Sequence, residues 1–266
     1  MSKIMLTGSQ GFIGQHAFKE LLGDVYPCLE ELTTQLTSVE PDTEYVVNLA
    51  SRSSVADSIK NPVAHMGNNI MLIINLLEMA RHLSKLKAFI HFSTVEVFSS
   101  DNPYAASKAS QDAIATAYQN TYGVPVILVT SQNVIGEGQR DDKFVPTLIR
   151  RIKSGDVVDI FVDEGKHGFR TYNPIANVIS ALNFILDLEP PTSLVRYDIS
   201  GGEELTNLEM AQKVAARLKQ HLNYREVEAH TVRTGYTRHL IADGVDLQEL
   251  GWTPPQTLDE GLAWIK

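Results

Sequence analysis

The chain has 266 residues, of which 43% are hydrophobic and 21% charged, as in folded globular proteins and unlike disordered chains. Its formal net charge of -9 argues against nucleic-acid and acidic-membrane partners, because both need clustered Lys and Arg. Cys28 is the only cysteine, which excludes a disulfide within the chain and favours the cytoplasm. The apolar run at 70–77 is too short to cross a bilayer, which takes ~20 residues. The eight His lack the spacing of metal ligands, so no metal site is expected.

Short apolar runs alternate with helical patterns along the first half of the chain. The runs are rich in branched residues and do not alternate with polar ones, as is typical of buried parallel strands. We expect strands at 3–6, 45–50, 87–93 and 124–130, and helices at about 12–22, 64–83 and 104–120. This order predicts an α/β fold with a doubly wound parallel sheet and helices on both faces.

After Gly136 the pattern is looser. We expect helices near 144–153, 174–187 and 205–220, strands near 157–162, 194–199 and 226–232, and a turn or linker at 188–193. The length exceeds that of one typical domain and falls short of two, which predicts one large domain with a smaller α/β lobe.

Three glycines directly follow the first expected strand, in MLTGSQGFIG (5–14). Gly8 would permit a tight turn, Gly11 would let backbone N–H groups approach a pyrophosphate, and Gly14 would let the helix pack on the strand. The helix N-terminus adds partial positive charge. The pattern predicts a dinucleotide site, and a glycine-rich turn that binds nothing is the alternative.

Tyr104 and Lys108 lie four residues apart on an expected helix, so both side chains project from one face. They follow IHFST, where Ser93 and Thr94 end a strand at the sheet edge that binds ligands in such folds. A phenol must lose about three pKa units, or ~4 kcal/mol, to act as a base at neutral pH. An ammonium at ~4 Å supplies ~4 kcal/mol at an effective dielectric of 20. We therefore expect Lys108 to activate Tyr104 while Thr94 binds the same substrate oxygen, with a surface Tyr and Lys pair as the alternative.

Ordered motifs along nearly the whole chain carry a resemblance. They are TGSQGFIG, VVNLAS, SVADSIKNP, NNIMLIINLLEMAR, HFSTVEVF, PYAASK, NVIGEGQ, GFRTY and RHLIAD, followed by ELGWTP. In these motifs the sequence resembles the extended short-chain dehydrogenases/reductases, in the NAD-dependent epimerase/dehydratase branch that acts on nucleotide sugars. The resemblance implies a Rossmann domain over 1–136, to which 174–200 could return, and a substrate lobe mainly over 137–266. It also implies a homodimer joined through the helices near 64–83 and 104–120.

Residue by residue, the resemblance implies three groups of functional side chains. The cofactor group is Gly8, Gly11, Phe12, Ile13, Gly14, Ala50, Asn69 and Ser93. The catalytic group is Thr94, Tyr104 and Lys108. The substrate group is Glu96, Asn133, Arg170 and Arg238. Both arginines offer planar donors that suit a diphosphate, and a solvated surface charge is the alternative for each.

The cofactor half departs from the family pattern. Only 23–44 separates the first helix from the next core strand, which leaves room for one short strand near 24–26 and one helix. About one βα unit is therefore missing. Glu30 and Glu31 stand about where a ribose-binding acid is expected, but the pattern favours an exposed helix face. NAD is favoured because no Arg lies in 15–51, and NADP stays open.

The catalytic half departs from the pattern as well. Val95 stands where the 4,6-dehydratases of the family carry an Asp proton donor, while Glu96 keeps the following acid. Because valine cannot donate a proton, we expect 4-epimerisation or 4-keto reduction of a nucleotide sugar rather than 4,6-dehydration. Thr130 and Asn177 stand where the family frequently has an Arg and an Asp, so the substrate lobe departs from the pattern too.

A function of another class is a dinucleotide-binding sensor or scaffold without turnover. The shortened cofactor half would suit such a protein. The intact Thr94, Tyr104 and Lys108 favour an enzyme, because a binding protein has no use for an activated phenol.

Overall fold

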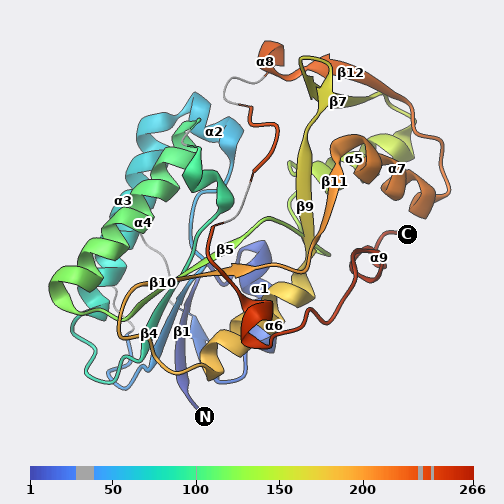
Figure 1. Ribbon diagram of the computed structural model, residues 1–266. Helices are drawn as coiled ribbons and strands as arrows, with labels where there is room; N and C mark the ends of the chain where they lie inside the picture. Colours follow the sequence, from blue (N-terminus) through green and yellow to red (C-terminus); the bar gives the residue numbers. More distant parts are fainter. Residues whose placement is uncertain (28–38, 100, 233–235, 241–242) are drawn as a thin grey trace.

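The structure is a computed structural model that describes residues 1–27, 39–99, 101–232, 236–240 and 243–266. Figure 1 shows a central sheet between helices, with a smaller lobe of strands and helices beside it. Glu30 and Glu31 lie outside the described residues, and so does the helix face expected there.

The main sheet has seven parallel strands in the order β13-β10-β5-β4-β3-β1-β2. The strands are β1 (Lys3–Thr7), β2 (Asp24–Pro27), β3 (Tyr45–Asn48), β4 (Ala88–Phe92), β5 (Val126–Ser131), β10 (Val195–Ile199) and β13 (Val245–Asp246). From β1 the chain crosses to β2 on one side and then to β3 on the other. This confirms the expected doubly wound sheet, whose ligands bind at the carboxyl edge where the order reverses.

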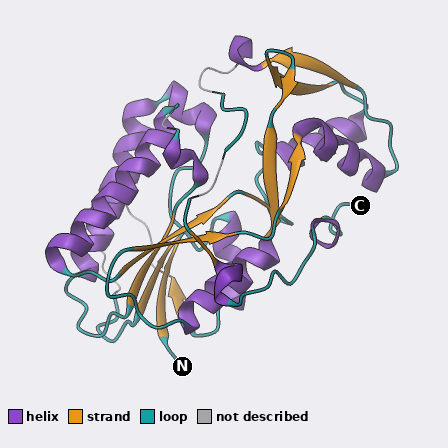
Figure 2. Ribbon diagram, viewed as in Figure 1, coloured by secondary structure: helices purple, strands orange, loops and turns teal. Residues whose placement is uncertain are grey.

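Helices cover both faces of the main sheet, as Figure 2 shows. They are α1 (Phe12–Glu20) and α6 (Ile175–Asp187) on one face, and α3 (Pro62–Ala80) and α4 (Pro103–Tyr122) on the other. Alternate residues of β1 pack against the two helix layers, one on each face of the sheet. Ile4 and Leu6 share a core cluster with Leu182 of α6, whereas Met5 shares another with Ile73 of α3. Burial on both faces explains why the strands are continuous apolar runs.

The helix that carries the expected catalytic pair has well-defined ends. The side chain of Asn102 caps α4 by accepting a hydrogen bond from Ala105 N at 2.9 Å. The helix ends at Gly123, whose φ of 71° is left-handed. Two short helices contact α4 and were not expected from the sequence, α2 (Val55–Lys60) and the 3-10 helix η1 (Val95–Phe98). Each is too short to show a helical period.

The smaller lobe contains two three-stranded sheets. The first has β6 (Asn133–Ile135), β9 (Phe169–Pro174) and β11 (Glu203–Thr206), and the second has β7 (Val158–Asp163), β8 (Lys166–His167) and β12 (Tyr224–Glu228). Helices α5 (Phe144–Ser154), α7 (Asn207–Leu218), α8 (Ala229–Val232) and α9 (Leu258–Gly261) and the 3-10 helix η2 (Leu247–Leu250) complete the described elements. The expected strand at 226–232 is wrong after residue 228, because pairing with β7 ends there and the chain enters α8.

The edge of the main sheet next to β1 agrees with the expected absence of about one βα unit from the cofactor half. Within the described residues, β2 is the outermost strand on this side, and 39–44 leads directly into β3.

No described helix is long and apolar enough to cross a bilayer. The described His, Cys, Asp and Glu side chains form no group that could hold a metal ion.

Candidate active site

The glycine turn lies between β1 and α1, where the strand order reverses. Gly8 has a φ of 71°, and a β-carbon on it would lie 2.8 Å from Ala50 N. A β-carbon on Gly14 would lie 1.8 Å from the carbonyl oxygen of Gly8. Gly11 N donates to the same oxygen at 2.9 Å, which closes the turn. Side chains at positions 8 and 14 would force the turn apart, and this agrees with the tight turn and close helix packing expected of these glycines.

The start of α1 is suited to an anion. Gly11 is its N-cap, no side chain caps it, and its first turn carries no acid. Phe12 and Ile13 begin the helix, but their side chains pack against His16 and the core, so they offer only backbone N–H groups. Those groups and the helix dipole provide the partial positive charge that a pyrophosphate needs. The turn therefore fits a dinucleotide.

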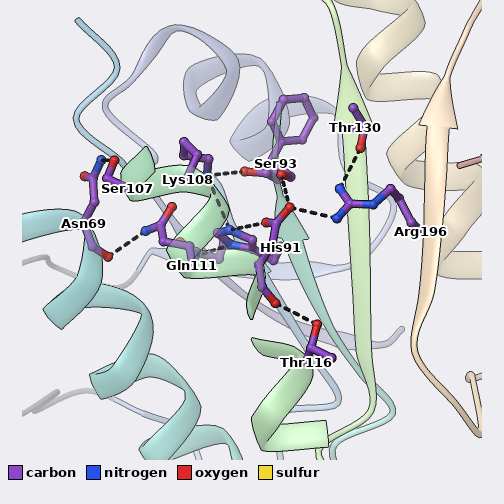
Figure 3. Close-up of polar contacts among 12 residues, drawn as sticks. Asn69, His91, Ser93, Ser107, Lys108, Gln111, Thr116, Thr130 and Arg196 are labelled. Atoms are coloured by element: carbon purple, nitrogen blue, oxygen red, sulfur yellow. Dashed lines mark hydrogen bonds and ion pairs between the residues drawn. The ribbon is translucent and has the colours of Figure 1, made fainter. Parts of the chain in front are cut away.

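Ala50 lies in the loop after β3, and Asn69 lies on α3 with its side chain bound to that loop. Ala50 N lies 3.3 Å from the hydroxyl of Thr7 and 3.2 Å from Asn48 Oδ1. The Asn69 amide accepts from Arg52 N at 2.8 Å and donates to Arg52 O at 3.1 Å. It also donates to the Ser107 hydroxyl at 2.9 Å, as Figure 3 shows. Asn69 thus fastens the loop to α4, and its side chain is fully engaged in doing so.

Thr94 and Tyr104 meet at the carboxyl edge of the sheet. Thr94 is the N-cap of η1, just after β4, and its side chain lies close enough to the phenol of Tyr104 to lower the pKa of that group. Tyr104 is half-buried, and its backbone N donates to Ser58 Oγ at 3.1 Å. Its ring packs edge-on against the ring of His65, with 6.1 Å between the ring centroids. The structure therefore brings together two of the three expected catalytic side chains.

Lys108 is one turn further along α4 and is only 3% exposed. Its Nζ donates to the carbonyl oxygen of Phe92 at 2.8 Å and lies 3.4 Å from His91 Nε2. Burial lowers the pKa of Lys108 to about 8, against the opposing effect of Asp112.

In the protein without cofactor the pKa of Tyr104 is raised, so the expected activation of Tyr104 by Lys108 stays a prediction. Burial raises the pKa of the phenol first and the Glu96 and Asp112 carboxylates raise it further, while the Thr94 side chain opposes them. The Lys108 ammonium is hydrogen-bonded to the Phe92 carbonyl group of β4.

A buried polar network behind Lys108 was not anticipated from the sequence (Figure 3). Ser93 donates to Asp112 Oδ2 at 2.7 Å, and Arg196 of β10 donates to the same oxygen at 2.9 Å. Arg196 also donates to the Thr130 hydroxyl at 3.1 Å. Although Thr130 replaces the family's frequent arginine, a guanidinium from the neighbouring strand reaches this position. A histidine inside the apolar run AFIHF was the one local sign of a polar core.

The expected substrate residues lie in or near the smaller lobe. Asn133 is exposed at the start of β6, and Arg238 is exposed. Glu96 is half-buried, and its Oε2 accepts from Asn102 Nδ2 at 3.4 Å. Val95 beside it is 4% exposed.

Arg170 uses three of its five guanidinium N–H donors within the protein. Its guanidinium donates to the carbonyl oxygens of Phe169 at 2.6 Å, Arg238 at 2.9 Å and Thr237 at 2.7 Å, and it stacks on Tyr236. These contacts fasten 236–240, here called the strap, to β9. The Thr237 hydroxyl donates to Asp101, just ahead of α4, so the strap spans from one lobe to the other.

Asn177, which stands in place of a frequent aspartate, has a structural role. Its amide donates to Asn173 Oδ1 at 3.1 Å and to Gln256 O at 2.9 Å, and it accepts from Gln256 N at 2.9 Å. It therefore joins α6 to the C-terminal segment.

Comparison with known proteins agrees with this geometry. The family model for GDP-mannose 4,6 dehydratase matches residues 29–265. A dTDP-glucose 4,6-dehydratase of Xanthomonas campestris pv. campestris is 28% identical over 87% of this chain and 73% of its own length. One from Streptomyces niveus is 30% identical over 82% of this chain and 67% of its own length.

Solved structures show the same fold. UDP-glucuronic acid 4-epimerase from Bacillus cereus, in complex with UDP-glucuronic acid and NAD, matches with a TM-score of 0.82 and 22% identity, over 99% of this chain and 97% of that one. The Thermus thermophilus UDP-glucose 4-epimerase complex with NAD has a TM-score of 0.81 and 20% identity, over 99% and 97% of the two chains. The chain belongs to the NAD-dependent epimerase/dehydratase family of extended short-chain dehydrogenases/reductases.

Proposed function

We propose that the protein is an NAD-dependent enzyme that inverts carbon 4 of a nucleotide sugar. The observation that carries this proposal is the meeting of the Thr94 side chain with the Tyr104 phenol, at the sheet edge that also holds the glycine turn. Relatives and structural neighbours include both 4,6-dehydratases and 4-epimerases, and several of those structures contain NAD.

Each group has a defined task in the proposed reaction. When bound, NAD accepts and returns a hydride and carries a positive charge. The glycine turn and the start of α1 would hold its pyrophosphate. The Tyr104 oxygen would take the proton of the sugar hydroxyl and later give it back, with the Thr94 hydroxyl holding the same sugar oxygen. Because burial and Glu96 raise the Tyr104 pKa in the protein alone, the phenol needs added positive charge before it can act as a base.

Val95 separates epimerisation from dehydration. A 4,6-dehydratase must protonate the departing hydroxyl group, and the valine at this position is buried and has no proton to give. The nearest acid in sequence, Glu96, faces Tyr104 and raises its pKa. This supports chemistry at carbon 4 alone, although the curated relatives compared above are dehydratases. Reduction of a 4-keto sugar needs the same residues and is the second candidate.

The proposal is tested by incubating the protein and NAD with UDP-, dTDP-, GDP- and CDP-sugars while following absorbance at 340 nm and identifying products by NMR. We expect a 4-epimer without net formation of NADH. Stoichiometric consumption of NADH with a 4-keto sugar would identify a reductase instead. A 4-keto-6-deoxy product would contradict the inference from Val95.

We further propose that Asn133, Arg238 and Glu96 contact the nucleotide sugar, while Arg170 acts by holding the strap. The exposed or half-buried positions of the three side chains support this assignment. NAD is proposed over NADP, since the neighbouring structures contain NAD. Calorimetry with both cofactors tests that choice, and binding of NADP alone would contradict it.

A homodimer through α3 and α4 is also proposed. Val63 and Met71 of α3 and Tyr122 of α4 are apolar side chains that are 87%, 50% and 53% exposed in the single chain. Light scattering on the purified protein tests this, and a monomeric mass at working concentration would contradict it.

A further inference from the structure

The charge on Lys108 depends on a small set of groups around its buried ammonium. Asp112 lies on the same helix. His91 lies on β4 and Arg196 on β10 (Figure 3). Tyr104 precedes Lys108 on α4, and from the elements packed against it Glu96 and His65 face the phenol. Among these groups, Asp112 is the carboxylate whose charge acts on Lys108.

Asp112 is held in a fixed position with its two oxygens in different surroundings. Oδ2 accepts from the Ser93 hydroxyl at 2.7 Å and from Arg196 Nη2 at 2.9 Å. Oδ1 is buried without a hydrogen-bond partner and lies 3.7 Å from His91 Nε2. The Oδ2 atom is therefore paired with the Arg196 cation, while Oδ1 carries part of the carboxylate charge without a hydrogen-bond partner.

Arg196 is a fixed cation. Besides Asp112, its guanidinium donates to the Thr130 hydroxyl at 3.1 Å and lies 5.3 Å from the centre of the Phe98 ring. Its side chain is 20% exposed, so solvent screens it only in part.

His91 separates these charges as a neutral ring. Burial, followed by the charges of Lys108 and Arg196, keeps the His91 pKa well below its usual value. Asn48 Oδ1 accepts from the Thr7 hydroxyl at 2.7 Å and from Ala50 N, so Asn48 Nδ2 must donate to His91 Nδ1, at 2.9 Å. The ring proton is then on Nε2, which faces Asp112 Oδ1 and Lys108. His91 therefore offers no negative charge to the ammonium.

We propose that Asp112 is the counter-ion that keeps Lys108 protonated and that Arg196, by partly neutralising Asp112, limits this effect, so that the two act as a positioning pair for the charge at the site. The inference deepens the proposed function, and only its consequence for turnover rests on that function.

The position of the Lys108 pKa makes such a pair effective. Burial lowers it to about 8, close to working pH, where a change of one unit alters the charged fraction strongly. Removing the Asp112 charge should lower the pKa of Lys108 by about one to two units, the usual effect of a nearby opposite charge. Removing the Arg196 charge should raise it by about half a unit to one unit, since the cation also repels the ammonium directly. Damage to packing alone would not give opposite signs.

The test is NMR titration of the full-length protein, free of ligands, with ¹³C-labelled lysine side chains, and Lys108→Arg identifies the Lys108 signal by its loss. We expect that signal to titrate near pH 8 in the original protein, lower in Asp112→Asn, higher in Arg196→Gln, and between these in the double variant. Arg196→Lys keeps the charge and is the matched control, with little shift expected. A Lys108 titration that Asp112→Asn leaves unmoved, or that Arg196→Gln shifts downward, overturns the proposal.

Folding and turnover are measured separately. Thermal melts accompany each variant, and if Asp112→Asn does not fold, the contrast between Arg196→Gln and Arg196→Lys decides the question. In an active enzyme, the alkaline limb of the pH profile of kcat should move in the same direction as the Lys108 titration. A limb that moves the opposite way would contradict the link between the Lys108 charge and turnover. If the original protein shows no turnover, the proposed function is contradicted, and the titration result still holds.

Discussion

The substitution Gly14→Ala isolates the close packing of the glycine turn. The added β-carbon would lie 1.8 Å from Gly8 O and 2.6 Å from Gly8 C, far inside contact distance. Both neighbours are backbone atoms, so relief requires α1 to move by more than about 1 Å from β1. Overpacking of this kind costs about 1–3 kcal/mol, and here we expect the upper end because no side chain can rotate away. The shifted helix start would also weaken NAD binding about tenfold or more, equivalent to ~1.4 kcal/mol.

Gly67→Ala is the matched control. Gly67 lies within α3, and a β-carbon there would meet nothing within 4 Å. It should raise the free energy of unfolding by about 0.5–1 kcal/mol, because alanine favours the helix. Urea denaturation measures the stability of both variants, and calorimetry measures NAD affinity. A Gly14→Ala protein as stable and as tightly binding as the original would refute the packing argument.

Three further predictions concern the catalytic phenol, the strap and the second half of the sheet. Tyr104→Phe should lower kcat by about 10²–10⁴-fold and leave NAD affinity unchanged by calorimetry, and an active variant would remove Tyr104 from the mechanism. Arg170→Ala frees the strap from β9, so KM for the sugar nucleotide should rise about tenfold, and an unchanged KM would show that the strap does not shape the site. Burial and the charge of Asp246 raise the pKa of Asp198 from its usual value of 3.8 to about 6. The raised pKa favours folding below about pH 4, and this benefit is lost as pH rises through about 6, so Asp198→Asn should stabilise the protein by about 2 kcal/mol at pH 8 and little at pH 4. Equal stability changes at both pH values, measured by urea denaturation, would contradict this assignment.

The sequence predicted those features that are local. The turn geometry at Gly8 and Gly14 follows from residue type, and the parallel strands follow from continuous apolar runs such as that of β4. The meeting of Thr94 with Tyr104 could be expected because one lies just after a strand and the other lies at the start of the next long helix.

The charge environment of Lys108 could not be predicted in the same way. Asp112 and Arg196 are 84 residues apart and meet only because β10 joins the main sheet beside β5. The direction of the Lys108 ammonium depends on the Phe92 carbonyl group, which no residue pattern reveals. The contacts of Arg170 with the strap backbone depend likewise on how the smaller lobe folds.

The shortened side of the main sheet leaves β2 as its outermost described strand. A bare strand edge invites pairing with other chains and therefore aggregation. Pro27 ends this strand and has no N–H to donate, and Asp24 places an exposed carboxylate at its start. Among the described residues, this edge therefore offers a foreign strand both an absent donor and a charge, which disfavours pairing with other chains.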